Sequence, residues 1–125
     1  MKKFSIRDRL RSFKYAFRGA LLLLSQEHNT WIHLTCAILA VGFGFHFGIS
    51  QSEWFAVIIS IGMVLSAEAF NTAIERIADY IQPDKDPNIA LIKDMAAGAV
   101  LFTAISAFIV GVIIFLPKFL SIITR

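Results

Sequence analysis

A group of polar side chains that could do chemistry lies directly after the uncharged run WFAVIISIGMVLSA. They are Glu68, Asn71, Thr72, Glu75 and Asp79. Because a helix turns by about 100° per residue, all of them fall within roughly 100° of arc and form one polar stripe. A helix that merely emerges into water would scatter its polar residues around its circumference. The stripe therefore predicts a functional site on one helix face.

The two ends of the polar stripe differ in depth and therefore in chemistry. If the preceding apolar run crosses a membrane, Glu68 lies roughly 7 Å inside its cytoplasmic end, and Glu75 lies about 10 Å further along the axis. A carboxylate inside the membrane marks a functional site by default and suits a general base acting on a lipid hydroxyl. Glu75 and Glu27, in the polar layer, could hold Mg²⁺, which prefers oxygen ligands. Lys93 could neutralise phosphate charge, so these residues predict phosphoryl transfer to a membrane alcohol.

The residues alone leave an alternative of another class, an oligomeric conduit for ions or small solutes. The chain has no G-x-x-x-x-G-K-[ST] loop and no protein-kinase glycine-rich loop. A conduit, however, should have polar positions across the whole bilayer, and Trp54 to Leu65 offers only Ser60. A plain structural anchor would leave the polar stripe unexplained.

Long apolar segments must position these groups. Hydrophobic residues make up 57 % of the chain and the mean hydropathy is +0.68. His28 to Ser52 and Met95 to Pro117 contain no Asp, Glu, Lys or Arg, and about 20 apolar residues cross a bilayer as a helix. We therefore expect an all-α membrane protein whose spans lie at 29–50, at 54–80 with a cytoplasmic extension, and at 88–117.

The segment before the first span predicts a two-faced helix over residues 1–26. Its apolar residues recur at spacings of three and four, at Ile6, Leu10, Phe13, Phe17, Leu21 and Leu24. A basic stripe flanks them, made of Arg7, Arg11, Lys14 and Arg18. Such a helix lies in the membrane interface, where its cations attract anionic lipid or hold phosphate. By the positive-inside rule, the N-terminus and the loop at 80–94 are cytoplasmic.

Several motifs together resemble the small prokaryotic diacylglycerol kinase family. EAFNTAIERIAD followed by KDMAAGAV is similar to the family pattern E-x-x-N-[ST]-A-I-E-x-x-x-D and a later Lys-Asp with small residues. FKYAFRG and QEHNTWIH also match, so the resemblance covers nearly the whole chain. It implies a homotrimeric lipid kinase of the bacterial inner membrane that uses ATP and Mg²⁺, with active sites shared between subunits. We expect no nucleic-acid partner.

The resemblance also implies a role for each matching residue. Glu68 would be the catalytic base on the lipid hydroxyl, with Asn71 binding the lipid beside it. Glu27 and Glu75 would hold the metal of the nucleotide. The other ATP contacts would be Tyr15, Asp84, Lys85, Asp86, Lys93 and Asp94.

Two branches share this scaffold, and one phosphorylates diacylglycerol to phosphatidic acid while the other phosphorylates undecaprenol. FKYAFRG and the pattern E-x-N-x-x-I-H at 27–33 look more like the undecaprenol branch. The expected product is therefore undecaprenyl phosphate, with diacylglycerol as the alternative substrate.

Overall fold

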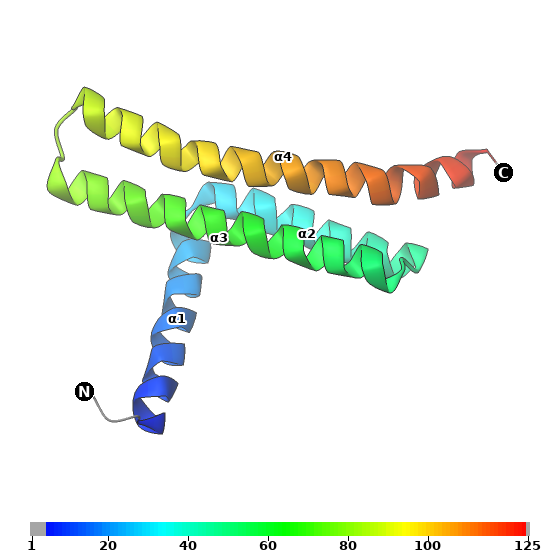
Figure 1. Cartoon of the computed structure of the whole chain (residues 1–125), viewed down its shortest axis with the longest axis horizontal. Coiled ribbons are helices and arrows are strands. Elements are labelled where there is room, and N and C mark those ends of the chain that lie inside the picture. Colours follow the sequence, from blue (N-terminus) through cyan, green and yellow to red (C-terminus); the bar gives the residue numbers. More distant parts are fainter. Residues whose placement is uncertain (1–4, 125) are drawn as a thin grey trace.

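The structure, a computed structural model, describes residues 5–124, and these form four α-helices. They are α1 (Ile6–Gln26), α2 (His28–Phe47), α3 (Gln51–Ile81) and α4 (Pro87–Ile123). In Figure 1 α2, α3 and α4 run side by side, whereas α1 projects away from them. The last three helices are long and apolar enough to cross a membrane. The prediction of an all-helical chain with three helices long and apolar enough to span a membrane is thereby confirmed.

A sharp corner at Glu27 joins α1 to α2. Glu27 has extended backbone angles, φ −113 and ψ 113, and is at once the last cap of α1 and the first cap of α2. Its N–H donates to the carbonyl of Leu23 at 3.2 Å, which closes the final turn of α1. One extended residue between two helices lets the chain change direction abruptly. The corner therefore sets where the Glu27 side chain lies relative to the rest of the protein.

The turn between α2 and α3 is short and closely packed. Gly48 ends α2 in the left-handed region at φ 59, which favours glycine because it has no Cβ. Ser50 and Glu53 then form a reciprocal capping box, in which the Ser50 N–H donates to Glu53 Oε2 at 2.7 Å. Gly44 allows the close approach of the two helices, since a Cβ there would lie 2.8 Å from the ring of Trp54.

The α3–α4 connection is set by Asp86. Its Oδ1 accepts the backbone N–H of Asn88 at 2.8 Å and of Ile89 at 3.1 Å, and Pro87 occupies the first helical position, where its missing N–H costs nothing. At the other end, α4 continues past Pro117 to Ile123, beyond the predicted span. A proline inside a helix removes one backbone hydrogen bond, and here it lies at an exposed position near the helix end.

A buried apolar cluster lies at the end of the molecule away from the polar stripe. Ile49, Val57, Ile114 and Phe115 form a buried cluster there. Phe119 stacks edge-on against Phe43 and Phe47, with ring centroids 5.2 and 4.9 Å apart. Lys118 Nζ donates to Glu53 Oε1 at 2.9 Å and joins α4 to the start of α3. These contacts hold α2, α3 and α4 together at this end of the helix bundle, which we call the fastened end.

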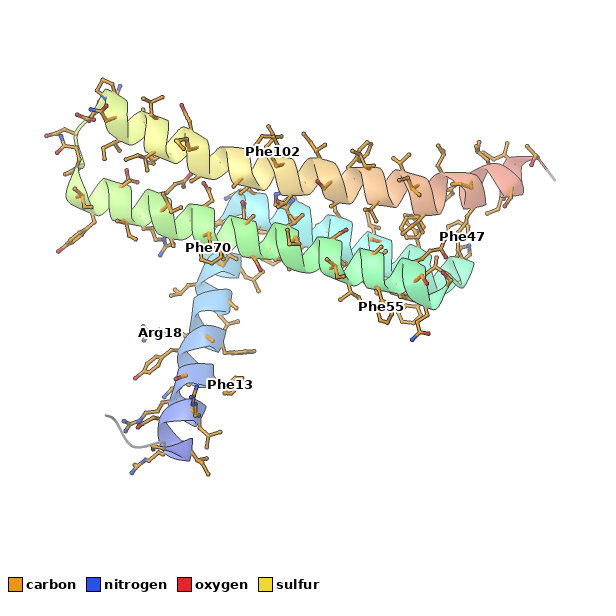
Figure 2. All side chains as sticks on the ribbon, in the orientation of Figure 1. Phe13, Arg18, Phe47, Phe55, Phe70 and Phe102 are labelled. Carbon is orange, nitrogen blue, oxygen red and sulfur yellow. The ribbon has the colours of Figure 1, made fainter. Side chains whose placement is uncertain are left out.

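Large apolar side chains cover much of the outside of the spans. Phe55 on α3 is 58 % exposed and Phe102 on α4 is 73 % exposed, and Figure 2 shows them pointing to opposite sides of the α3–α4 pair. Such a surface suits lipid tails or neighbouring subunits rather than water. On α1, Phe13 and Arg18 point to opposite sides of the helix, so α1 has an apolar and a basic side (Figure 2).

The α3 helix is longer than a bilayer requires. Its 31 residues correspond to about 46 Å, against a hydrocarbon core of roughly 30 Å. Figure 1 shows the C-terminal end of α3 and the N-terminal end of α4 extending together past the α1–α2 corner. The C-terminal part of the polar stripe lies on this extension.

Candidate active site

The polar stripe lies on α3 and changes from buried to exposed along its length. Glu68 and Thr72 are buried, at 3 % and 7 % exposure. Asn71 and Glu75 are half-buried, and Asp79 is exposed. Burying a carboxylate costs free energy unless partners or substrates compensate for it. The burial of Glu68 therefore lowers the stability of the fold, which indicates a functional reason for this residue.

The Asn71 amide is arranged with one polar atom available for a ligand. Its Nδ2 donates to Glu75 Oε1 at 3.1 Å, one turn along the same face of α3. Its Oδ1 is buried and finds no hydrogen-bond partner within residues 5–124. A buried acceptor without a partner costs about 1–3 kcal/mol. The Asn71 oxygen is thus suited to accept a hydrogen bond from a hydroxyl that binds beside Glu68.

The α1–α2 corner brings a further carboxylate to this face of α3. Glu27 Oε1 lies 3.6 Å from Arg76 Nη2, and the Glu27 side chain is 29 % exposed. Glu27 and Glu75 both lie within electrostatic range of the Glu68 carboxylate. Glu27 from the α1–α2 corner and Glu75 from α3 thus both act electrostatically on Glu68, and we call these three residues the acidic cluster.

His33 on α2 also lies within electrostatic range of Glu68. It was not among the predicted site residues, because no ligand at metal spacing and no catalytic motif marks it in the sequence. Only the packing of α2 against α3 places it near the acidic cluster.

The acidic cluster fits a metal that is bound jointly with a substrate. The part of the chain that the structure describes contains no group of three or more His, Cys, Asp or Glu side chains placed to hold a metal ion by themselves. Mg²⁺ commonly takes only one or two protein carboxylates and completes its shell with water and substrate phosphates. Glu27 and Glu75 are both half-buried and come from different elements, so they match such a partial donor set.

A cation lies at the exposed end of the polar stripe. Lys93 on α4 donates from Nζ to Asp79 Oδ1 at 2.7 Å, which joins α4 to α3. Lys93 also lies within electrostatic range of Glu75. Its side chain is 33 % exposed, so a phosphate could still reach the ammonium group.

The other predicted nucleotide residues are spread over separate elements. Tyr15 is 65 % exposed on α1, which projects away from α3 and α4 (Figure 1). Asp84 and Lys85 are exposed in the loop between α3 and α4, and Asp94 is exposed next to Lys93. Asp86 is engaged as the cap of α4, so any contact with ATP would have to share that carboxylate.

A groove of about 660 Å³ runs between α1, α2 and α3. Its walls are mostly apolar, and its polar members include Thr30, Thr72 and Arg76. Because Thr72 and Ala69 line it, the groove adjoins the face of α3 that carries Glu68. Its mostly apolar lining with a few polar residues suits the binding of an apolar chain with a polar end.

A second groove, of about 610 Å³, lies between α2, α3 and α4. Apart from His33, Cys36 and Ser60, its lining is apolar, and it reaches Phe119 at the fastened end. Such a lining does not replace the hydration of an ion.

Comparison with known proteins gives a consistent assignment. The family model described as prokaryotic diacylglycerol kinase matches residues 14–115. An undecaprenol kinase from Bacillus subtilis is 38 % identical over 108 residues, which cover 86 % of this chain and 88 % of that protein. A diacylglycerol kinase from Synechocystis sp. is 31 % identical over 112 residues, which cover 89 % of this chain and 64 % of that protein.

Proposed function

The chain belongs to the prokaryotic diacylglycerol kinase family, and from that membership we propose that it transfers the γ-phosphoryl group of ATP to undecaprenol. It is a lipid kinase, and the choice of lipid rests on its similarity to the undecaprenol kinase. The observation that carries the proposed chemistry is the burial of Glu68 in a membrane-length helix beside the Asn71 amide oxygen.

Glu68 is the proposed general base. The lipid hydroxyl first binds with its O–H donated to the Asn71 oxygen. Rotation about the C–O bond then turns the same O–H to Glu68, which takes the proton as the hydroxyl oxygen attacks the γ-phosphorus. The bond between this phosphorus and the bridging oxygen to the β-phosphate breaks, and ADP leaves with the electron pair. Because Glu68 is 3 % exposed, bulk water has little access and competes poorly with the lipid hydroxyl. Hydrolysis of ATP is thereby suppressed.

Residues nearer the exposed end of the polar stripe are proposed to bind the nucleotide phosphates and their metal. Glu27 and Glu75 would hold Mg²⁺, which when bound offsets the phosphate charge. Lys93 donates hydrogen bonds to phosphate oxygens from the side of α4. The 3.6 Å separation of Glu27 Oε1 from Arg76 Nη2 is an ion pair that is longer than a direct hydrogen bond.

The groove between α1, α2 and α3 is the proposed binding site of the lipid chain. An apolar tail would lie between α1, α2 and α3, with its hydroxyl end turned toward the neighbouring face of α3 that bears Glu68; the lining residues Ala69 and Thr72 support this. The remaining ATP contacts are proposed as Tyr15, Asp84, Lys85, Asp86 and Asp94.

A homotrimer with shared active sites is part of the proposal. Within one chain the proposed nucleotide residues lie on α1, on the α3–α4 loop and on α4, and a site shared between subunits would bring such separate elements together. The exposed apolar side chains of the spans offer surfaces for that contact. We place the protein in the bacterial inner membrane with its N-terminus and the α3–α4 loop on the cytoplasmic side, where ATP is available.

Diacylglycerol remains the alternative substrate, because the chain is also similar to a diacylglycerol kinase and both lipids present a hydroxyl at the same depth. An ion conduit is less favoured, since the groove between the spans has an almost wholly apolar lining.

The deciding experiment offers undecaprenol and diacylglycerol side by side to the purified protein with labelled ATP in one detergent. Faster transfer to undecaprenol is expected. A clear preference for diacylglycerol would reverse the choice of substrate, and transfer to neither lipid would refute the proposed reaction.

A further inference from the structure

The ion pair between Lys93 and Asp79 lies one helical turn from Glu75, a proposed metal ligand. It joins α4 to α3 with a distance of 2.7 Å between Nζ and Oδ1. Asp79 follows Glu75 by one helical turn on the same face, and Glu75 acts electrostatically on Lys93 as well. The Lys93 ammonium therefore pairs directly with Asp79 and also feels the charge of Glu75, and only Glu75 is a proposed metal ligand.

Which of these carboxylates pairs with Lys93 affects how the nucleotide phosphates can be bound. An ammonium group has three N–H donors, so Lys93 can keep one on Asp79 and still offer two to phosphate oxygens. A lysine side chain is flexible and loses rotamer freedom when it is fixed. Without Asp79, the other carboxylate that acts on Lys93 is Glu75. Pairing there would occupy a carboxylate that the metal needs.

We propose that Asp79 is a positioning residue that holds Lys93 in place for the nucleotide phosphates and away from Glu75. This inference rests on the proposed function, in which Lys93 contacts phosphate. Asp79 itself touches neither the phosphate nor the lipid, and it acts through the lysine. Its exposure suits this role, since the pair remains accessible to a soluble nucleotide.

The same two helices carry a second ion pair that provides a matched control. Glu53 and Lys118 join α3 to α4 at the opposite, fastened end, with 2.9 Å between Oε1 and Nζ. If the Asp79 pair merely fastened the helices, loss of either pair would have similar consequences. If it positions Lys93, only loss of the Asp79 pair changes nucleotide binding.

The test measures KM for ATP, kcat, and the Kd of a non-hydrolysable ATP analogue by calorimetry, with the full-length protein in detergent. The variants are Asp79→Asn, Asp79→Glu, Lys93→Met, the double variant Asp79→Asn with Lys93→Met, and Glu53→Gln. We expect Asp79→Asn to raise both KM for ATP and the analogue Kd about three- to fivefold, the range of an exposed ion pair, with kcat within about twofold. Asp79→Glu should restore binding, and Glu53→Gln should leave KM and Kd unchanged.

The double variant shows whether Asp79 acts through Lys93. In the Lys93→Met background, Asp79→Asn should have no further effect on analogue binding. A further loss there, no rescue by Asp79→Glu, or equal effects of Asp79→Asn and Glu53→Gln would each overturn the inference. A lower KM in Asp79→Asn would also overturn it, because Asp79 would then compete with phosphate. Failure of the wild-type protein to phosphorylate either lipid would instead refute the proposed function itself.

Discussion

Replacing Glu68 by Gln tests the proposed chemistry most directly. Gln keeps nearly the same size and shape but cannot accept the proton of the lipid hydroxyl. Because Glu68 is only 3 % exposed, solvent can hardly reach the hydroxyl to act in its place. We therefore expect a loss of kcat toward the upper part of the range of about 100- to 10,000-fold for general-base catalysis. The whole range corresponds to about 2.7 to 5.4 kcal/mol of activation free energy, and the expected loss lies toward its upper end.

The same substitution should not unfold the protein. The charge of Glu68 is opposed by burial and by the like charges of Glu27 and Glu75, whereas His33 favours it. A neutral Gln removes both costs, and the thermal unfolding temperature should stay unchanged or rise. Loss of activity with retained stability would then point to the chemical step rather than to folding.

The assay follows transfer from labelled ATP to undecaprenol under single-turnover conditions, together with binding of a non-hydrolysable ATP analogue. Binding should stay within about threefold of the wild type, because Glu68 acts on the lipid hydroxyl and not on the nucleotide. Glu53→Gln, on the same helix but at the fastened end, serves as the control and should retain full activity. A wild-type rate in Glu68→Gln would refute the role of Glu68 as the base.

Three further predictions concern neighbouring residues. Glu75→Gln should raise the Mg²⁺ concentration for half-maximal activity about tenfold or more, because one of two proposed ligands is lost; an unchanged Mg²⁺ titration would argue against that role. Asn71→Leu should lower kcat/KM for the lipid about tenfold, through loss of the hydroxyl contact, and a lipid titration that matches the wild type would contradict it. Gly44→Ala should lower the free energy of unfolding by about 1–3 kcal/mol, since its Cβ would lie 2.8 Å from the ring of Trp54; unchanged denaturant unfolding in detergent would show that this contact relaxes.

Local periodicity allowed the polar stripe to be predicted from sequence alone. A helix repeats every 3.6 residues whatever surrounds it, so the common face of Glu68, Asn71 and Glu75 follows from their spacing. The spans follow from composition in the same way, because a bilayer requires about 20 apolar residues in sequence. The structure adds the detail that α4 continues past Pro117, where an exposed helix end tolerates the lost hydrogen bond.

The partners that the stripe meets could not be obtained from spacing. Glu27 reaches the acidic cluster because a single extended residue turns α1 into α2, and His33 comes near Glu68 only because α2 packs on α3. Lys93 meets Asp79 because the short loop capped by Asp86 returns α4 along α3. Face and depth along one helix are properties of the local chain, and they were determined by the sequence itself. The convergence of groups from different helices depends on corner angles and side-chain packing between them, and only the tertiary structure decided it.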